Sequence, residues 1–326
     1  MRRLTLSGVE AARAVPGRAA LLYLTDRCPV GCAHCSVDSL PLGPRITDGE
    51  RFGQVLDTLC AEPALSVVGI SGGEPFLERA ALTAAVRRLT EAGKRVVPYT
   101  SGYWGRSWPP PPWVGEVLRL SSCLVLGADA FHAARLPAGA LANAVRAAAG
   151  AGTWVVCQVL EGEAEHRAAE EALRGALGDG WEAYAEIGAV PLLPYGRAGE
   201  LRPPGAAGPA ARPLSGPGRC TAAGTPVVRY DGRVSACCNE VVAMGGGPAA
   251  LRHRITDPGV LPRLAADPYL TALTTLGAAA VTALPRLRDL ADEPVTGLCD
   301  LCWRIAARGT DHADLRALAL LAGSRP

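Results

Sequence analysis

The sequence lacks a long apolar run, an excess of charge of one sign and a secretion signal. Hydrophobic residues make up 49% of the chain, yet no run approaches the roughly 18–20 apolar residues that a membrane-spanning helix needs. The 33 basic and 31 acidic residues are interspersed, so charge favours neither nucleic acid nor membrane as a partner. Residues 1–18 contain Arg2 and Arg3 but neither an apolar core nor a small-residue cleavage site. We therefore expect a soluble cytoplasmic protein.

Cysteine, by contrast, is frequent. Eleven cysteines in a chain without a secretion signal indicate metal or redox chemistry before disulfides. Cys60, Cys123 and Cys157 lie in apolar periodic segments, where a cysteine is usually a small buried hydrophobe. The remaining cysteines form two groups, far apart in sequence, within segments rich in Gly and Pro. These two groups hold the candidate metal ligands.

The first group is the segment Cys28-Pro29-Val30-Gly31-Cys32-Ala33-His34-Cys35, which directly follows an apolar run. Thiolates at this C-x3-C-x2-C spacing reach three corners of a four-iron cluster and leave the fourth iron without a protein ligand. That iron is a place for a small molecule to bind. A disulfide pair and a zinc knuckle are the alternatives, but zinc usually takes two separated pairs of ligands, which fits this segment less well.

Strands and helices alternate along the first part of the chain. Short apolar runs predict strands, and the segments between them predict helices. This alternation predicts a parallel α/β sheet with right-handed crossovers. A closed eightfold barrel needs two more units, so a partial barrel or an open doubly wound sheet is implied. The expected strands lie at 19–25, 65–70, 95–100, 123–127, 154–160 and about 183–193, and the expected helices at about 47–60, 77–92, 114–120, 138–149 and 163–177.

Polar or flexible residues follow several of these strands. The carboxyl ends of parallel strands meet at one edge of the sheet, where chemistry collects. We therefore expect one mouth shared by the cysteine segment, Gly72-Gly73-Glu74-Pro75, Thr100-Ser101-Gly102 and Asp129.

The composition changes after the sixth expected strand. Residues 196–219 are rich in Pro, Gly, Ala and Arg without periodicity, which predicts a linker or irregular loop. Residues 227–237 predict a hairpin with Asp231-Gly232 at its turn. Helices are expected near 261–276 and 313–321. The predicted division is an N-terminal arm (1–18), a barrel (19–195), the linker (196–219) and a C-terminal domain (220–326).

The cysteine spacing together with Gly72-Gly73-Glu74-Pro75 resembles the radical S-adenosylmethionine (radical SAM) superfamily. The resemblance covers about residues 19–193 and implies a partial (β/α)6 barrel. It also implies that Cys28, Cys32 and Cys35 ligate a [4Fe–4S] cluster, whose open iron chelates the amino and carboxylate groups of SAM. Pro194-Tyr195-Gly196-Arg197-Ala198 resembles the family's junction between barrel and tail.

The resemblance extends to cofactor-binding residues. His34 takes the family's often aromatic position beside the cluster; a solvent-facing loop histidine is the alternative. In Gly72-Gly73-Glu74-Pro75, the absence of Cβ at the two glycines lets the backbone approach a ligand closely. Carbonyl oxygens there can accept hydrogen bonds from an ammonium group. All four residues of that segment are therefore candidate SAM-binding residues.

Later strand ends add further candidates. Thr100 and Ser101 resemble the family's polar ending of the third strand, or form an ordinary turn. Asp129 and His132 resemble the fourth-strand segment of the peptide-modifying and cofactor-building branch, where polar groups face SAM or substrate; they are candidate catalytic residues, or instead cap the next helix. Gln158, polar within an apolar strand, points into the barrel or is a buried amide bonded to backbone.

The second group of cysteines lies in the tail. The pattern Cys220-x11-Gly232-x4-Cys237, followed by Cys299-x2-Cys302, resembles the auxiliary-cluster module called SPASM in full form and twitch when shortened. The module's later C-x5-C-x3-C part is absent, which favours one auxiliary [4Fe–4S] cluster. Cys238 is a rival for Cys237, and a four-cysteine zinc site is the alternative to a cluster. The expected ligands are Cys220, Cys237, Cys299 and Cys302.

The resemblance implies reductive cleavage of SAM to methionine and a 5′-deoxyadenosyl radical, which takes hydrogen from an unactivated substrate carbon. The expected reaction is an oxidative cross-link or related change in a ribosomal peptide precursor. The alternatives are oxidation or epimerisation of a small sugar, nucleoside or cofactor precursor, and, more remotely, a noncatalytic iron–sulfur or zinc protein.

Two kinds of protein partner are also expected. One is a flavodoxin or ferredoxin that donates electrons. The 18 residues before the first expected strand are too few for a leader-peptide recognition domain. A separate recognition protein, a leaderless substrate or a non-peptide substrate would each account for that.

Overall fold

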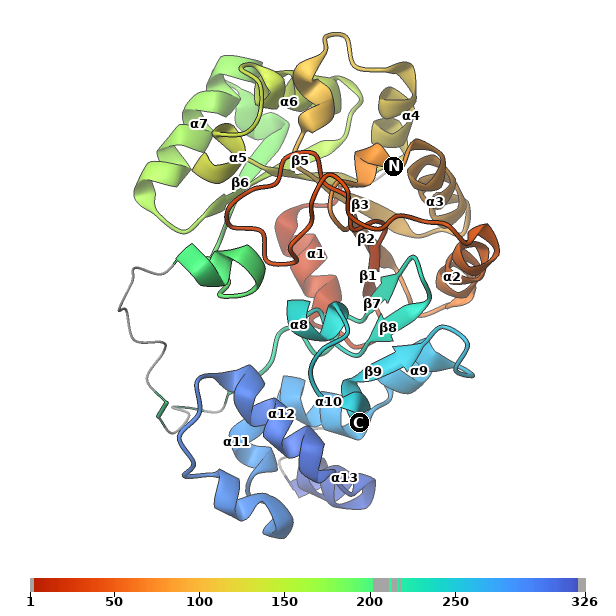
Figure 1. Cartoon of the computed structure of the whole chain (residues 1–326), viewed down its shortest axis with the longest axis vertical. Helices are drawn as coiled ribbons and strands as arrows, with labels where there is room; N and C mark the ends of the chain where they lie inside the picture. The colour runs from red at the N-terminus through yellow and green to blue at the C-terminus, as the bar shows by residue number, and fades with distance from the viewer. Residues whose placement is uncertain (1–2, 202–210, 213–215, 217, 322–326) are drawn as a thin grey trace. The chain divides into compact units, whose positions relative to one another are not determined.

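The computed structural model (Figure 1) describes residues 3–201, 211–212, 216 and 218–321. The chain divides into two compact units, each of which is described separately below. The first unit comprises Met1–Ala12, Leu21–Arg202 and Arg229–Gly232, and the second comprises Arg13–Ala20, Pro203–Val228 and Arg233–Pro326.

A parallel sheet forms the core of the first unit. Its strands follow the spatial order β6-β5-β4-β3-β2-β1, and β2 through β6 pair in parallel with their neighbours. Most Val, Ile and Leu side chains of β1 through β5 are buried, as expected for strands covered on both faces, whereas Ile187 and Val190 of the terminal strand β6 are partly exposed. The predicted α/β class and parallel sheet are therefore confirmed. The strands are β1 (Ala19–Tyr23), β2 (Val67–Ser71), β3 (Arg95–Thr100), β4 (Cys123–Gly127), β5 (Trp154–Leu160) and β6 (Ala185–Val190).

Helices connect these strands and lie on the outer side of the sheet (Figure 1). The start of α2 shows why they form where predicted, because Asp48 caps it by accepting a hydrogen bond from Arg51 N at 2.8 Å. One face of that helix then buries four apolar side chains. The helices are α2 (Gly49–Ala61), α3 (Arg79–Glu91), α4 (Pro112–Leu120), α5 (Ala130–Ala133), α6 (Ala140–Gly150) and α7 (Glu163–Leu177), with short 3-10 turns η1 (Pro75–Leu77), η2 (Tyr103–Arg106), η3 (Trp181–Ala183) and η4 (Gly196–Leu201).

Within the segment expected as an arm, Leu6–Arg13 form helix α1. This helix is 8 residues long and is not predicted by the local sequence pattern. The chain before it is tied to the amino-terminal ends of the strands: Leu4 N donates to Ser122 O at 3.2 Å, and Leu6 N donates to Glu186 Oε1 at 2.7 Å. These contacts lie at the end of the sheet opposite the carboxyl ends of the strands.

The second unit combines a small antiparallel arrangement with short helices. The predicted hairpin is present: β7 (Val227–Arg229) pairs with β8 (Arg233–Ser235), and Gly232 at the turn has φ +82°. The residues at its tip, Arg229–Gly232, belong to the first unit. β8 also pairs with β9 (Arg252–Arg254). The helices are α8 (Glu240–Ala243), α9 (Val260–Ala265), α10 (Pro268–Thr275), α11 (Ala278–Val281), α12 (Leu298–Arg308) and α13 (His312–Leu321), with 3-10 turns η5 (Ala249–Leu251) and η6 (Pro285–Leu290).

Part of the predicted linker, 202–210, 213–215 and 217, lies outside the described residues. The predicted domain limits stay a prediction. Across the described ranges, no helix is both long enough and apolar enough to span a membrane.

Candidate active site

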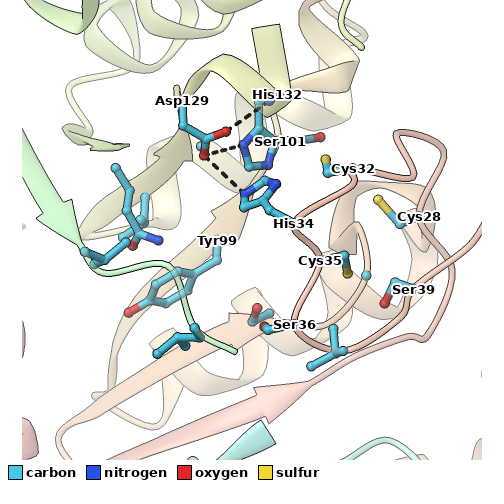
Figure 2. A pocket seen from close by; sticks show the side chains of 18 of the residues that line it. Cys28, Cys32, His34, Cys35, Ser36, Ser39, Tyr99, Ser101, Asp129 and His132 are labelled. Carbon is cyan, nitrogen blue, oxygen red and sulfur yellow. Dashed lines mark hydrogen bonds and ion pairs between the residues drawn. The ribbon is translucent and has the colours of Figure 1, made fainter. Parts of the chain in front are cut away.

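The carboxyl ends of the strands surround a cavity of about 260 Å³ (Figure 2). Its walls come from the loops after β1 through β4 and from β5 and the segment after β6. The cavity brings most of the expected site residues together, and Glu74 and Pro75 are buried beside it instead of lining it. The expected residues that line it are Cys28, Cys32, His34, Cys35, Gly72, Gly73, Thr100, Ser101, Asp129, His132 and Gln158.

The cysteine loop follows β1 and turns back on itself. Cys35 N donates to Cys32 O at 3.2 Å, and Gly31 adopts φ +59°. Burial raises the pKa of the Cys28 thiol to about 11, although hydrogen bonds from the Val30 and Gly31 backbone oppose the shift. A metal must therefore displace a firmly held proton from this thiol when it binds.

The glycines after β2 are required by backbone packing. A Cβ on Gly72, which has φ +142°, would lie 2.5 Å from Thr25 O, and one on Gly73 would lie 2.1 Å from Arg27 O. Because neither residue has a Cβ, the two backbone segments approach closely enough for Gly73 N to donate to Thr25 O at 2.6 Å and for Glu74 N to donate to Arg27 O at 2.7 Å. The glycine pair therefore fastens the loop after β2 to the start of the cysteine loop, a reason additional to the approach of a ligand.

Glu74 joins the ends of β2 and β3. Its side chain, with the residue 1% exposed, accepts hydrogen bonds at Oε1 from Phe76 N (3.1 Å) and Thr100 Oγ1 (2.8 Å). Oε2 accepts from Ser101 N (2.8 Å) and Ser101 Oγ (2.5 Å). Burial raises the pKa of Glu74, and these hydrogen bonds oppose the shift. Thr100 and Ser101 thus hold this carboxyl group while they line the cavity.

Asp129 caps the next helix and also lines the cavity. Its Oδ1 accepts from His132 N at 3.1 Å and so caps α5, while Oδ2 lies 2.8 Å from His132 Nδ1 and 3.4 Å from His34 Nε2 (Figure 2). Burial raises the pKa of Asp129, but the two histidines outweigh this and hold it well below its usual range. The carboxylate is therefore ionised at neutral pH.

His132 lies between this carboxylate and the cysteine loop. Burial lowers its pKa, but hydrogen bonding to Asp129 and Cys32 raises it to about 10. The ring lies over the end of β4, where a Cβ on Gly127 would be 2.7 Å from its Cε1. Glycine at 127 therefore makes room for the imidazole.

His34 is turned into the site, so it is not a solvent-facing loop residue. Its ring stacks on Phe131 with centroids 4.7 Å apart, and its side chain is 15% exposed. Nε2 faces Asp129, while Nδ1 is buried and has no hydrogen-bond partner among the described residues. A buried nitrogen of this kind is normally satisfied, so it fits a bound molecule that supplies a donor. Gln158, beside Gly127 in the register of β4 and β5, lines the same cavity.

No family model matches the chain. YydG of Bacillus subtilis (strain 168), assigned by its name to peptide biosynthesis, is 25% identical over 86 residues, which is 26% of this chain and 27% of that relative's length. The structure is similar to Streptococcus suis SuiB bound to S-adenosylmethionine, with TM-score 0.53, 11% identity, and coverage of 91% of this chain and 75% of that one.

Two further solved structures are similar. Native anSMEcpe with bound AdoMet has TM-score 0.51 and 13% identity, and covers 94% of this chain and 100% of its own. SuiB bound to its precursor peptide SuiA has TM-score 0.52 and 10% identity, with coverage of 80% and 67%. The chain shares the fold of SuiB and anSMEcpe. The resemblance inferred from the motifs is therefore confirmed at the level of the fold.

The second unit contains the tail cysteines. Cys299 and Cys302 lie in the first turns of α12, where Cys299 Sγ is 3.5 Å from Asn239 Nδ2 and Cys302 Sγ accepts from Tyr269 OH at 3.2 Å. Burial raises the pKa of the Cys302 thiol to about 12, while the Tyr269 hydroxyl opposes the shift.

Cys237 and Cys238 differ in surroundings. The pKa of the Cys237 thiol is raised by burial and then by the nearby Cys238, Cys302 and Cys220. Cys238 Sγ instead accepts a hydrogen bond from Arg13 Nη2 at 3.2 Å. Burial raises the pKa of Cys238, and the Arg13 guanidinium is the main opposing influence.

Sequence reasoning missed Arg197, which lines the cavity. Its guanidinium donates to carbonyl oxygens of the cysteine loop. The only signal was the resemblance of residues 194–198 to the junction between barrel and tail, which assigns no role to the side chain.

Proposed function

We propose that this chain is a radical SAM enzyme, which binds a [4Fe–4S] cluster through Cys28, Cys32 and Cys35 and cleaves SAM reductively. When bound, these groups supply one-electron chemistry that removes hydrogen from an unactivated carbon. The observation that carries the proposal is that the three-cysteine loop, the glycine pair after β2 and the polar ends of β3 and β4 face a single cavity.

The number and spacing of the cysteines support a cluster over zinc. A structural zinc ion usually takes four protein ligands in two pairs, whereas the loop offers three thiols in the segment 28–35. Three thiolates can ligate three corners of a four-iron core. Among the described residues, a group of three ligand atoms that lie within 4.8 Å of one another is formed by His34, Asp129 and His132, and it contains no cysteine.

The polar groups of the cavity suit SAM. The unpartnered His34 Nδ1 would accept from a hydroxyl or amino group, and ionised Asp129 orients the imidazoles of His34 and His132. Glu74 is already occupied by four hydrogen bonds. We therefore assign Glu74 to holding the strand ends in place and not to contacting a ligand.

We propose a ribosomal peptide precursor as the substrate and an oxidative cross-link or related modification as the outcome. Support comes from the match to YydG, assigned by name to peptide biosynthesis, and from the likeness to SuiB bound to its precursor peptide. Because the match spans 27% of YydG, both substrate and product are proposals. A flavodoxin or ferredoxin would deliver the electrons.

We further propose one auxiliary [4Fe–4S] cluster in the second unit. Support comes from the electrostatic influence of neighbouring cysteines on three of these thiols. Besides the effect of burial, the pKa of Cys220 is raised in part by Cys299 and Cys238, that of Cys237 by Cys238, Cys302 and Cys220, and that of Cys302 by Cys220 and Cys299. Burial raises the pKa of Cys220, Cys237 and Cys302, so these thiols stay protonated unless a cation binds. A cluster with four protein ligands would leave no iron open and would suit electron transfer.

The test is anaerobic reconstitution with iron and sulfide, followed by assay of 5′-deoxyadenosine with SAM and dithionite. Wild type should form 5′-deoxyadenosine. The Cys28→Ala/Cys32→Ala/Cys35→Ala variant should form none and keep about half the iron, in the auxiliary cluster. Wild type that cleaves no SAM, or a triple variant that keeps all its iron, would contradict the SAM-cluster proposal. A triple variant that loses all iron would contradict the auxiliary cluster.

The substrate class is tested separately. Short open reading frames beside the gene would be expressed as peptides and incubated with reconstituted enzyme, SAM and reductant. We expect one peptide to lose a pair of hydrogen atoms, measured by mass spectrometry, and expect no loss with the triple variant. Unchanged peptides together with oxidation of a sugar or nucleoside would overturn the peptide assignment and leave SAM cleavage intact.

A further inference from the structure

Arg197, which follows the last strand of the parallel sheet, donates hydrogen bonds to the cysteine loop. It lies in η4, the turn after β6, and its Nε and Nη2 both donate to Cys32 O, at 3.0 and 2.9 Å. Nη2 also donates to Ser39 O at 3.1 Å. Hydrogen bonds from a charged donor are stronger than neutral ones, and the planar guanidinium fixes their direction. One side chain therefore holds the loop at two points on either side of Cys35.

The backbone next to Arg197 holds Cys35 as well. Arg197 N donates to Cys35 O at 3.0 Å. Gly196 adopts φ +53°, and a Cβ there would lie 2.5 Å from Cys35 O and 2.8 Å from the carbonyl carbon of Ser36. Only glycine fits such a contact. The segment 196–197 is thus shaped to the part of the loop that carries the second and third cysteines.

The charge of Arg197 is held beside the loop and is incompletely compensated. Its side chain is 23% exposed, and Asp38 Oδ1 lies 3.8 Å from Nη1, a long ion pair with a partner that is 61% exposed. Such an exposed pair is strongly screened by solvent. A cation therefore remains near Cys32, on the wall of the cavity that Arg197 helps to line.

We propose that Arg197 is a positioning residue for the SAM cluster. It fixes the carbonyl groups of Cys32 and Ser39 so that the thiolates are held ready for iron, and its charge favours the reduced cluster. This inference rests on the proposed cluster. The cysteine loop is otherwise irregular, so removal of the side-chain clamp loosens the loop at Cys32 and Ser39 while the backbone bond from Arg197 N to Cys35 O remains. Addition of an electron is more favourable beside a fixed positive charge.

Two substitutions separate geometry from charge. Arg197→Gln removes the charge and keeps a short pair of N–H donors, whereas Arg197→Lys keeps the charge but loses the fork that spans both carbonyls. Arg146→Gln is the matched control, because Arg146 also donates through Nε to Ala176 O (3.1 Å) and through Nη2 to Gly175 O (3.2 Å). Its carbonyl partners lie on α7, outside the residues that line the cavity.

The readouts are taken on full-length reconstituted protein from the EPR signal that changes when SAM is added. Loss of this signal to an iron chelator should be about 10–100-fold faster in both Arg197 variants than in wild type, the usual effect of removing a group that orients metal ligands. The midpoint potential of the same signal should become more negative in Arg197→Gln and stay close to wild type in Arg197→Lys. Arg146→Gln should match wild type in both readouts.

If wild type binds and cleaves SAM while Arg197→Gln matches the Arg146→Gln control in chelation rate and potential, Arg197 has no positioning role and the proposed function stands. If wild type shows no SAM-responsive signal, the proposed function fails and this inference fails with it. Circular dichroism checks folding. Should Arg197→Gln not fold, Arg197→Lys decides: faster loss of the signal supports the clamp, and loss at the wild-type rate overturns it.

Discussion

Replacement of Glu74 with glutamine isolates the buried carboxyl group that joins the ends of β2 and β3. Each of its oxygens accepts one backbone N–H and one hydroxyl. In Glu74→Gln, an NH₂ group replaces one of the two oxygens. That NH₂ group then faces one backbone N–H and one hydroxyl, and it cannot accept a hydrogen bond from either. The hydroxyl can rotate away, but the backbone N–H of Phe76 or Ser101 cannot. A buried unsatisfied N–H costs about 1–3 kcal/mol. We therefore expect a destabilisation of about 1–3 kcal/mol.

The assay is equilibrium urea unfolding of the apoprotein, followed by circular dichroism. Glu116→Gln is the matched control, because Glu116 pairs with Arg87 on the surface and exposed pairs contribute only about 0–1 kcal/mol. Equal unfolding midpoints for the two variants would refute the assigned role of Glu74. The carboxyl group would then be free to contact a ligand.

Two further predictions concern the loop after β2 and the tail. Gly73→Ala should destabilise the apoprotein by about 3 kcal/mol or more, because its Cβ would lie 2.1 Å from Arg27 O. Gly53→Ala, a helical site with nothing within 4 Å, should stabilise it by about 1 kcal/mol; equal thermal shifts would contradict the packing argument. Cys237→Ala should lower the iron content of reconstituted protein by about half, while Cys238→Ala should leave it unchanged. The reverse result in an iron assay would make Cys238 the ligand.

Most strands and helices of the fold are predictable from local sequence patterns. Short apolar runs bounded by Gly, Pro and polar residues predict the strands, because parallel strands that are buried on both faces consist almost entirely of apolar residues. The cap at Asp48 and the Asp231-Gly232 turn were readable for the same reason, since each acts over a few residues. The grouping of Cys28, Gly72 and Thr100 at one cavity followed from the parallel topology.

Contacts between distant segments were beyond local patterns. Nothing near Arg197 indicates that its guanidinium meets Cys32 O, 165 positions away. The approach of His34 to Asp129 depends on two loops that meet only in the folded structure, whereas His132 lies three positions after Asp129 in the same capped turn. The glycines at 72 and 73 were assigned to ligand approach, whereas their neighbours in the structure are the Thr25 and Arg27 carbonyl groups.

The central claim is that Cys28, Cys32 and Cys35 hold a cluster whose open iron binds SAM. EPR spectroscopy of the dithionite-reduced, reconstituted protein, recorded with and without SAM, tests it most directly. We expect wild type to show a signal that changes when SAM is added, and the Cys28→Ala/Cys32→Ala/Cys35→Ala variant to lack that component. A wild-type iron–sulfur signal that is identical with and without SAM would contradict the account.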